Sequence, residues 1–187
     1  IMMIPYVRLE EDRKELPFDC GDKDLNEFLS CDAILYSRQL LAVTYCLDRK
    51  DETILYFSLS NDKLAAIEVS KSFWRKIKNS FPHDKHRKDY PAVKIGRFAV
   101  NSKYQHTAEH WGTEALNFIK QWMITDNKTG CRFITVDAYK QAVPFYQKNN
   151  FFFMGKEEEE RYNQEKEDLN SDSTFSMFYD LSRLKDE

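Results

Sequence analysis

The chain has 187 residues, of which 42% are hydrophobic and 14% aromatic, with only five glycines and five prolines. This composition excludes disordered, collagen-like and repeat proteins, and the length suits a single domain over residues 1–187. The formal net charge of −3 argues against a uniformly basic surface of the kind that binds nucleic acids.

No apolar run approaches the roughly 18 residues that a membrane-spanning helix needs, and the start of the chain lacks a basic segment followed by an apolar one. We therefore expect a cytoplasmic protein without membrane contact. The four cysteines are scattered, with no CxxC pair and no histidine at ligand spacing. They are expected to be reduced, mostly buried thiols, and no metal site is predicted.

The first forty residues predict an edge strand followed by a helix. Residues 4–9 have the pattern of an edge strand, and a polar turn through Pro17 and Gly21 follows. Either Asp22 or Asp24 can cap the helix. The inner side of this helix is expected to carry Leu25, Phe28, Leu29 and Leu35.

A hairpin and a basic helix are expected next. Residues 42–47 and 53–59 alternate between apolar and polar side chains on either side of a turn at 48–52, which predicts an antiparallel hairpin. Residues 70–81 then form a basic, amphipathic pattern that predicts a helix. Its anchors are Phe73, Trp74 and Ile77.

The rest of the chain alternates between apolar segments and helical patterns. Residues 91–100 are almost entirely apolar, as expected for a central strand covered on both faces. The next helix has its buried side at Trp111, Ala115, Phe118, Ile119 and Trp122. Further strands are predicted at 132–138, 151–154 and 174–181, with a short helix at 141–149. The segment 156–172 is expected to be a charged insertion, as a loop or hairpin extension.

This order of elements resembles the acyl-CoA-binding core of the GNAT N-acyltransferase superfamily. The resemblance rests on VKIGRFAVNSKYQ (93–105), GTEALNFIKQW (112–122) and CRFITVDAYKQAVPFYQKNNF (131–151). It implies an α/β fold with a mixed, mostly antiparallel sheet, a splayed central pair of parallel strands and helices on both faces. It also implies acetyl-CoA as the cofactor and the transfer of its acetyl group to a primary amine.

The GNAT resemblance implies two sets of backbone amides that hold the cofactor. In the superfamily, amides near the end of the first splayed strand bind the pantetheine arm, and the matching residues are Phe98, Ala99 and Val100. A Gln or Arg, two residues, Gly, one residue and Gly then open a helix whose N-terminus holds the pyrophosphate. The positions implied for this second set are Gln105, His110, Trp111, Gly112 and Thr113.

The loop before this helix departs from the family pattern. Two extra residues follow Gln105, His110 stands in place of the inner glycine, and Glu109 adds a negative charge beside the expected phosphates. His106 and His110 can contribute positive charge if they are protonated. We expect a weakened but working pyrophosphate site, and the alternative is a site that has been lost.

Residues 142–151 resemble the family's A-x-x-F-Y-x-K-x-G-F motif, with Asn150 where glycine is usual. Tyr146 matches the tyrosine beside the cofactor sulfur, where a neutral phenol can protonate the leaving thiolate. The alternative is that the Phe-Tyr pair only packs in the core. The general base stays unassigned, because Asp137 can equally be a structural residue.

Residues 18–33, FDCGDKDLNEFLSCDA, are similar to an F-x-C/S-G-x-x-x-L-x-x-F-L segment of the GNAT toxins of bacterial toxin-antitoxin modules. That resemblance implies aminoacyl-tRNA as the acceptor and a ribbon-helix-helix antitoxin as a partner. A homodimer is a further expectation, since many GNAT proteins dimerise. The alternatives are a GNAT enzyme acting on a small-molecule or protein amine, and a GNAT-fold binding protein without catalysis.

The charges are unevenly placed along the chain. Residues 71–94 hold eight Lys and Arg against two Asp, together with two His. Such a patch can hold a tRNA arm through its phosphates, whereas the alternative is an ordinary solvated helix and loop. The acidic run at 157–168 would repel RNA and is expected to lie away from any such path.

Overall fold

The computed structural model describes residues 6–65, 69–79, 89–125, 127, 129–168 and 172–184, and for residues 76–79 it describes the backbone alone. Contacts between Cα atoms divide the chain into two compact units. The first comprises residues 1–60 and 95–119, and the second comprises residues 61–94 and 120–187.

The described strands form a seven-stranded sheet in the order β1-β2-β3-β4-β5-β7-β6. They are β1 (Val7–Arg8), β2 (Val43–Arg49), β3 (Glu52–Ala65), β4 (Asp89–Val100), β5 (Phe133–Tyr139), β6 (Phe152–Phe153) and β7 (Thr174–Asp180). The pair β4–β5 is parallel, whereas β1–β2, β2–β3, β5–β7 and β6–β7 are antiparallel. The predicted mixed, mostly antiparallel sheet with one central parallel pair is therefore confirmed.

The α-helices are α1 (Lys23–Glu27), α2 (Ala33–Arg38), α3 (Lys71–Asn79), α4 (Trp111–Thr125), α5 (Val143–Lys148) and α6 (Lys156–Glu165). A π-helical segment, η1 (Phe28–Asp32), lies between α1 and α2. Short 3-10 segments are η2 (Ser102–Tyr104), η3 (Lys140–Ala142) and η4 (Leu181–Leu184).

The first predicted helix is present, but a π-helical turn interrupts it. The amide of Leu25 donates to Asp22 Oδ1 at 3.0 Å, so Asp22 is the N-cap. A π-helical turn holds one more residue than an α-helical turn, which rotates the helix that follows. Leu35 consequently lies on the exposed side, with 50% of its surface accessible, while Ala33 is buried. Our expectation that Leu35 faces inward was wrong.

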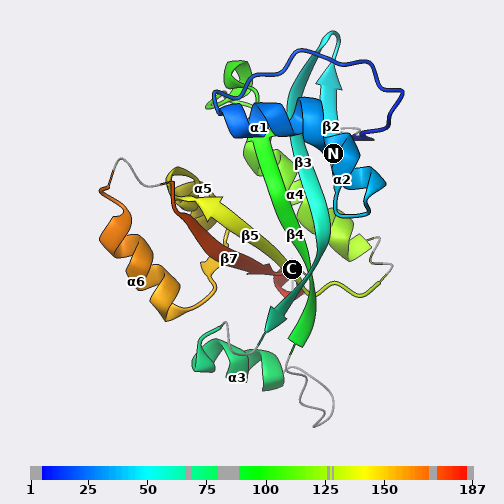
Figure 1. Ribbon diagram of the computed structural model, residues 1–187. Coiled ribbons are helices and arrows are strands. Elements are labelled where there is room, and N and C mark those ends of the chain that lie inside the picture. Colours follow the sequence, from blue (N-terminus) through cyan, green and yellow to red (C-terminus); the bar gives the residue numbers. More distant parts are fainter. Residues whose placement is uncertain are drawn as a thin grey trace. The chain divides into compact units, whose positions relative to one another are not determined.

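The hairpin of β2 and β3, coloured cyan in Figure 1, is also confirmed. Neighbouring side chains of a strand point to opposite faces, as Tyr56 and Phe57 of β3 illustrate. The ring of Phe28 stacks on Tyr56 with 6.1 Å between centroids. Phe57 contacts Tyr6, which in turn contacts Phe118 of α4. Within the first unit, helices therefore cover both faces of the sheet.

The second unit has an aromatic core under α3. Its buried residues are Leu64, Val69, Tyr90, Ala92, Phe133 and Phe178. Two predicted anchors of α3 pack against this core, Phe73 at 4.6 Å from Phe178 and Trp74 at 5.2 Å from Tyr90, measured between ring centroids. The third predicted anchor, Ile77, lies outside the described side chains.

In the charged segment 156–172, which we expected as a loop or hairpin extension, Lys156–Glu165 instead form a helix, α6, shown in orange in Figure 1. Three glutamates occupy its first turn, where the helix dipole favours negative charge. Ion pairs one turn apart join Glu158 to Arg161 at 2.7 Å and Lys156 to Glu160 at 3.5 Å. The charges that suggested a loop therefore stabilise a helix.

Four residues on the inner face of helix α4 are buried: Ala115, Leu116, Ile119 and Lys120. Ala115 and Ile119 were predicted from the apolar spacing. The burial of Lys120, which is only 5% exposed, was not predicted.

The cysteines are all free, but they are not mostly buried as expected. Cys46 is buried, Cys20 and Cys131 are partly exposed, and Cys31 is exposed.

Candidate active site

The end of β4 is tied to the N-terminal loop through Gln105. Its Nε2 donates to the carbonyl oxygens of Val100 at 2.7 Å and Cys20 at 3.0 Å. The predicted cofactor residues Phe98 and Ala99 precede this point in the same strand. Because its side-chain amide donates to both carbonyls, Gln105 links the two backbone segments.

Asn101 also links two backbone segments, which the sequence did not predict. Its amide donates to the carbonyl of Ile54 at 2.8 Å, and its Nδ2 donates to the carbonyl of Thr53 at 3.1 Å. Its Oδ1 accepts from Lys103 at 3.2 Å and so caps η2. The strand end that precedes the loop is therefore held by hydrogen bonds to β3 and not only by packing.

The loop between β4 and α4 contains two histidines in the left-handed backbone region. The φ angles are +56° at His106 and +49° at His110. Non-glycine residues pay about 1–2 kcal/mol for this conformation, which glycine adopts freely. His110 thus has a backbone conformation that favours glycine, the residue that the GNAT pattern places there.

The first turn of α4 follows His110 directly. The carbonyl of His110 accepts the amide of Glu114 at 3.0 Å, while its own amide donates to Thr107 at 3.2 Å. The amides of Trp111, Gly112 and Thr113 precede that first helical hydrogen bond, so they stand at the positive end of the helix dipole. This is the arrangement that binds anions at helix N-termini.

Glu109 lies within the same loop and carries a negative charge. Its own backbone N–H and the Thr107 hydroxyl hold the pKa of its carboxyl below the usual value. The ionised carboxylate therefore opposes an anion at the start of α4, in line with the weakened site expected from the sequence.

In the second unit, Tyr146 lies on α5 and is only 4% exposed. Its ring contacts those of Phe145 and Phe151, each at 5.3 Å between centroids. Burial raises the pKa of the phenol above its usual value, so the group keeps its proton at neutral pH. Asn150, which stands where the family has glycine, has a φ of +63°, in the left-handed region that glycine adopts freely.

Asp137, for which the sequence leaves open a role as general base or as structural residue, forms an ion pair. Lys94 Nζ lies 2.5 Å from Asp137 Oδ2, and the Ser176 hydroxyl donates to Asp137 Oδ1 at 2.9 Å. Although burial opposes them, these bonds lower the pKa of the carboxyl. A carboxylate held this way is a weak proton acceptor, which favours the structural role.

The basic stretch is only partly described. Lys71 and Arg75 are exposed on α3, whereas Lys94 is neutralised by Asp137. The side chains of Lys76, Lys78, Lys85, Arg87 and Lys88 lie outside the described residues.

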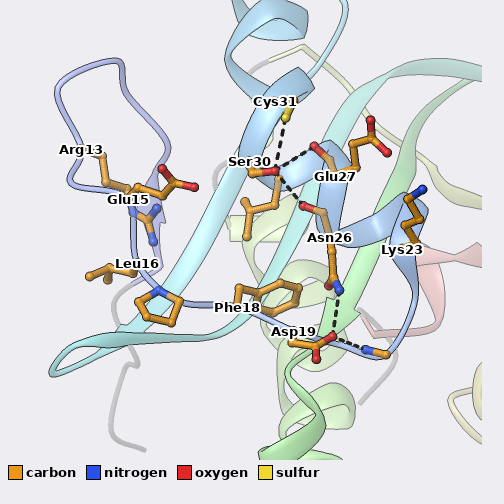
Figure 2. Close-up of a pocket in the computed structure, with 13 residues that line it drawn as sticks. Arg13, Glu15, Leu16, Phe18, Asp19, Lys23, Asn26, Glu27, Ser30 and Cys31 are labelled. Carbon is orange, nitrogen blue, oxygen red and sulfur yellow. Dashed lines mark hydrogen bonds between the residues drawn. The ribbon is translucent and has the colours of Figure 1, made fainter.

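A cavity of about 1050 Å³ opens in the first unit between the N-terminal loop and the segment α1–η1 (Figure 2). Its wall includes Phe18 and Asp19, from the segment that resembles the toxins, and extends to Cys31. Asn26 Nδ2 and the amide of Gly21 both donate to Asp19 Oδ1 at 2.8 Å. The polar residues Asp19 and Asn26 of this segment thus shape a turn, and no predicted cofactor residue lines the cavity.

Among the described residues, no helix combines the length and apolar character needed to cross a membrane. Nor do these residues contain a group of three or more His, Cys, Asp or Glu side chains that could hold a metal ion.

No family model and no curated protein matches the sequence. Solved structures do match. A bacterial toxin has a TM-score of 0.70 at 15% identity, covering 97% of this chain and 93% of its own. AtaT complexed with acetyl-methionyl-tRNAfMet scores 0.67 at 21% identity, with 97% and 96% covered.

A KacT mutant in which phenylalanine replaces a tyrosine scores 0.66 at 21% identity, with 90% and 88% covered. Other matching structures hold AtaT with its antitoxin AtaR or with acetyl-CoA. The similarity extends along nearly the whole chain, and the chain therefore has the GNAT fold in the form that these toxins share.

Proposed function

We propose that this protein is an acetyl-CoA-dependent N-acetyltransferase whose acceptor is the amino group of an aminoacyl-tRNA. One observation carries the proposal: 97% of the chain shares its fold with AtaT, a toxin solved with acetyl-methionyl-tRNAfMet and, in other structures, with acetyl-CoA. The segment at 18–33 supports the same reading, because its sequence matches the toxin pattern, and in this chain it forms a turn followed by a helix start.

The residues present fit acetyl-CoA. The amides of Phe98, Ala99 and Val100 are the candidates for holding its pantetheine arm, on a strand whose end is fixed by Gln105 and Asn101. The amides of Trp111, Gly112 and Thr113 are the candidates for its pyrophosphate. The left-handed backbone at His110 supports this assignment, because the GNAT pattern uses glycine there.

Acetyl-CoA supplies the thioester whose carbonyl carbon an amine attacks. As the new C–N bond forms and the C–S bond breaks, the departing sulfur needs a proton and the amine nitrogen loses one. Tyr146 is the candidate donor to the sulfur, since its buried phenol stays neutral. The pairing of Asp137 with Lys94 makes that carboxylate a poor acceptor for the proton from nitrogen, so we propose that this proton passes to solvent.

The partners follow from the same comparison. AtaT is solved with the antitoxin AtaR, so we propose a ribbon-helix-helix antitoxin as a protein partner. Residues 71–94 are the candidate tRNA contact, supported by exposed Lys71 and Arg75. A small-molecule or protein amine is the competing acceptor, and a homodimer stays a prediction.

A second candidate is a GNAT-fold protein that binds without catalysing. It is favoured by the loop expected to receive the pyrophosphate, where His110 stands in place of the inner glycine and Glu109 is ionised.

Calorimetric titration with acetyl-CoA and, separately, with CoA tests the cofactor. Incubation with radiolabelled acetyl-CoA then compares three acceptors: methionyl-tRNA, uncharged tRNA and free methionine. Label on methionyl-tRNA alone supports the proposal. Binding of acetyl-CoA without transfer to any amine supports the second candidate, and absence of binding in folded protein overturns both the cofactor and the reaction.

A further inference from the structure

Helix α4 carries a buried lysine. Lys120 Nζ donates to the carbonyl of Asn149 at 2.8 Å and lies 4.2 Å from the ring centroid of Tyr179 and 5.6 Å from that of Phe151. Burying an ammonium is costly unless it is compensated. No carboxylate among the described residues pairs with it, so one carbonyl and two ring faces provide the compensation.

The carbonyl that Lys120 holds lies at the end of α5, the helix that carries Tyr146. The amide of Asn149 donates to the carbonyls of Tyr146 at 3.0 Å and Phe145 at 3.2 Å, and its Nδ2 also donates to Phe145 at 2.9 Å. Asn149 is thus bonded back into the last turn of α5, and a cation at a helix C-terminus is favourable. The Lys120 ammonium therefore stabilises the last turn of α5.

The chain then turns back toward Tyr146. After the left-handed residue Asn150, the amide of Phe151 donates to the carbonyl of Tyr146 at 3.0 Å. The Phe151 ring lies 5.3 Å from Tyr146 and 5.6 Å from Tyr179. Lys120 consequently contacts both the backbone and the ring that fix Tyr146 from its C-terminal side.

We propose that Lys120 is a positioning residue for Tyr146, acting through the ammonium–carbonyl hydrogen bond to Asn149 and the contact with Phe151. The inference rests on the proposed function, in which Tyr146 donates the proton to the leaving sulfur.

The positioning role of Lys120 can be measured by following activity as its ammonium loses a proton. Burial, with a smaller contribution from Arg183, lowers the pKa of Lys120 from 10.5 to about 8. The titratable groups that face the ammonium are Arg183 of η4 and the phenol of Tyr179 of β7, while the α5 turn presents a carbonyl. Tyr146 itself stays neutral in this range, because burial raises its pKa.

The test compares Lys120→Met, Lys120→Arg and a control, Lys156→Met, which removes an exposed lysine of α6. The assay uses acetyl-CoA and saturating methionyl-tRNA across about pH 6.5 to 9.5, so that the pKa is bracketed. At neutral pH we expect Lys120→Met to lower kcat about tenfold and to change the KM for acetyl-CoA less than about twofold, since small misplacements of a catalytic group are costly.

The ratio of wild-type to Lys120→Met kcat should decrease as pH rises through about 8, because the neutral amine donates a weaker hydrogen bond to Asn149 than the ammonium does. Lys120→Arg should keep a higher kcat than Lys120→Met at the upper end, and Lys156→Met should match the wild type throughout. A folded Lys120→Met with wild-type kcat, or a ratio that is constant with pH, overturns the proposal.

A readout without catalysis separates this inference from the proposed function. NMR of the wild type with ¹³C-labelled lysine follows the titration of Lys120, and ¹⁵N spectra follow the amides of Asn149, Asn150 and Phe151. A shared midpoint supports the coupling even if the protein acetylates nothing or Lys120→Met does not fold. Amide signals that stay unmoved while Lys120 titrates overturn it.

Discussion

Burial determines what Tyr146 can do at neutral pH. With its pKa raised, the phenol is available as a proton donor and not as a base. We expect Tyr146→Phe to lower kcat by about 100- to 10,000-fold, the usual contribution of general acid catalysis. Acetyl-CoA affinity and Tm should stay near wild type, because only one hydroxyl is lost. Tyr162→Phe on α6 is the control, and an undiminished rate where chemistry limits turnover would exclude the role.

The two histidines of the β4–α4 loop offer a matched pair of substitutions. Replacing either one by glycine relieves about 1–2 kcal/mol of left-handed strain but costs about 0.5–1 kcal/mol of chain entropy, for a net gain of up to about 1.5 kcal/mol. We expect both His106→Gly and His110→Gly to raise the free energy of unfolding by this amount in urea titrations. Only His110→Gly should tighten acetyl-CoA binding, since only His110 borders the start of α4. An equal change in affinity for both variants would contradict the loop assignment.

Among the elements, those with strong periodicity followed from the sequence. The apolar run of β4 and the alternation in β2 gave strands close to those observed, whereas β3 extends to Ala65, beyond the predicted end at residue 59. The exposure of Leu35 could not be foreseen, because the π-helical turn before it leaves no mark in the apolar spacing. Helix α6 was missed for another reason: its stabilising groups are charged pairs and one aromatic anchor, Tyr162, which contacts Phe153 and Phe175.

The attachment of α6 to β7 depends on Arg161. Its guanidinium lies 4.2 Å from the ring centroid of Phe175 and donates to the carbonyl of Thr174 at 2.6 Å and to Glu158 at 2.7 Å. We expect Arg161→Met to lower the free energy of unfolding by about 1–2 kcal/mol, since two charge-assisted bonds are lost and the one to Glu158 is partly shielded from water. Lys156→Met, which breaks an exposed pair, should change it by less than about 0.5 kcal/mol. Equal effects of the two substitutions in urea denaturation would show that the contacts of Arg161 with Phe175 and Thr174 contribute little.

At the scale of the whole molecule, the motifs identified candidate positions but not what their side chains do. The pattern placed Gln105 at the pyrophosphate, whereas the structure commits its side chain to Val100 and Cys20. Asn101 and Lys120 were not foreseen, because their partners lie at least 29 residues away in the sequence. Long-range hydrogen bonds of this kind carry no local periodicity, so a single sequence does not reveal them.

The formal net charge of the molecule is −3, yet residues 71–94 concentrate eight basic side chains against two acidic ones. If this stretch contacts tRNA phosphates, replacing Arg75, Lys76 and Lys78 by Glu should weaken tRNA binding and flatten its salt dependence. Each lost phosphate contact removes about 0.7 to 0.9 from the slope of log affinity against log salt. Acetyl-CoA affinity should be unchanged, since none of the proposed cofactor residues lies on α3. Replacement of exposed Lys14, Lys50 and Lys156 by Glu is the control with the same change in net charge.

Growth arrest on induced expression tests the catalytic role of Tyr146 and the tRNA contact in one measurement. A toxin that acetylates aminoacyl-tRNA needs both the chemistry and the RNA contact, so Tyr146→Phe and the reversal of Arg75, Lys76 and Lys78 should each relieve the arrest. The control reversal should arrest growth as the wild type does, because it changes the net charge equally but leaves 71–94 intact. A wild type that is harmless without an antitoxin, and that fails to retain tRNA at low salt, would contradict the tRNA acceptor and leave a small-molecule or protein amine as the better proposal.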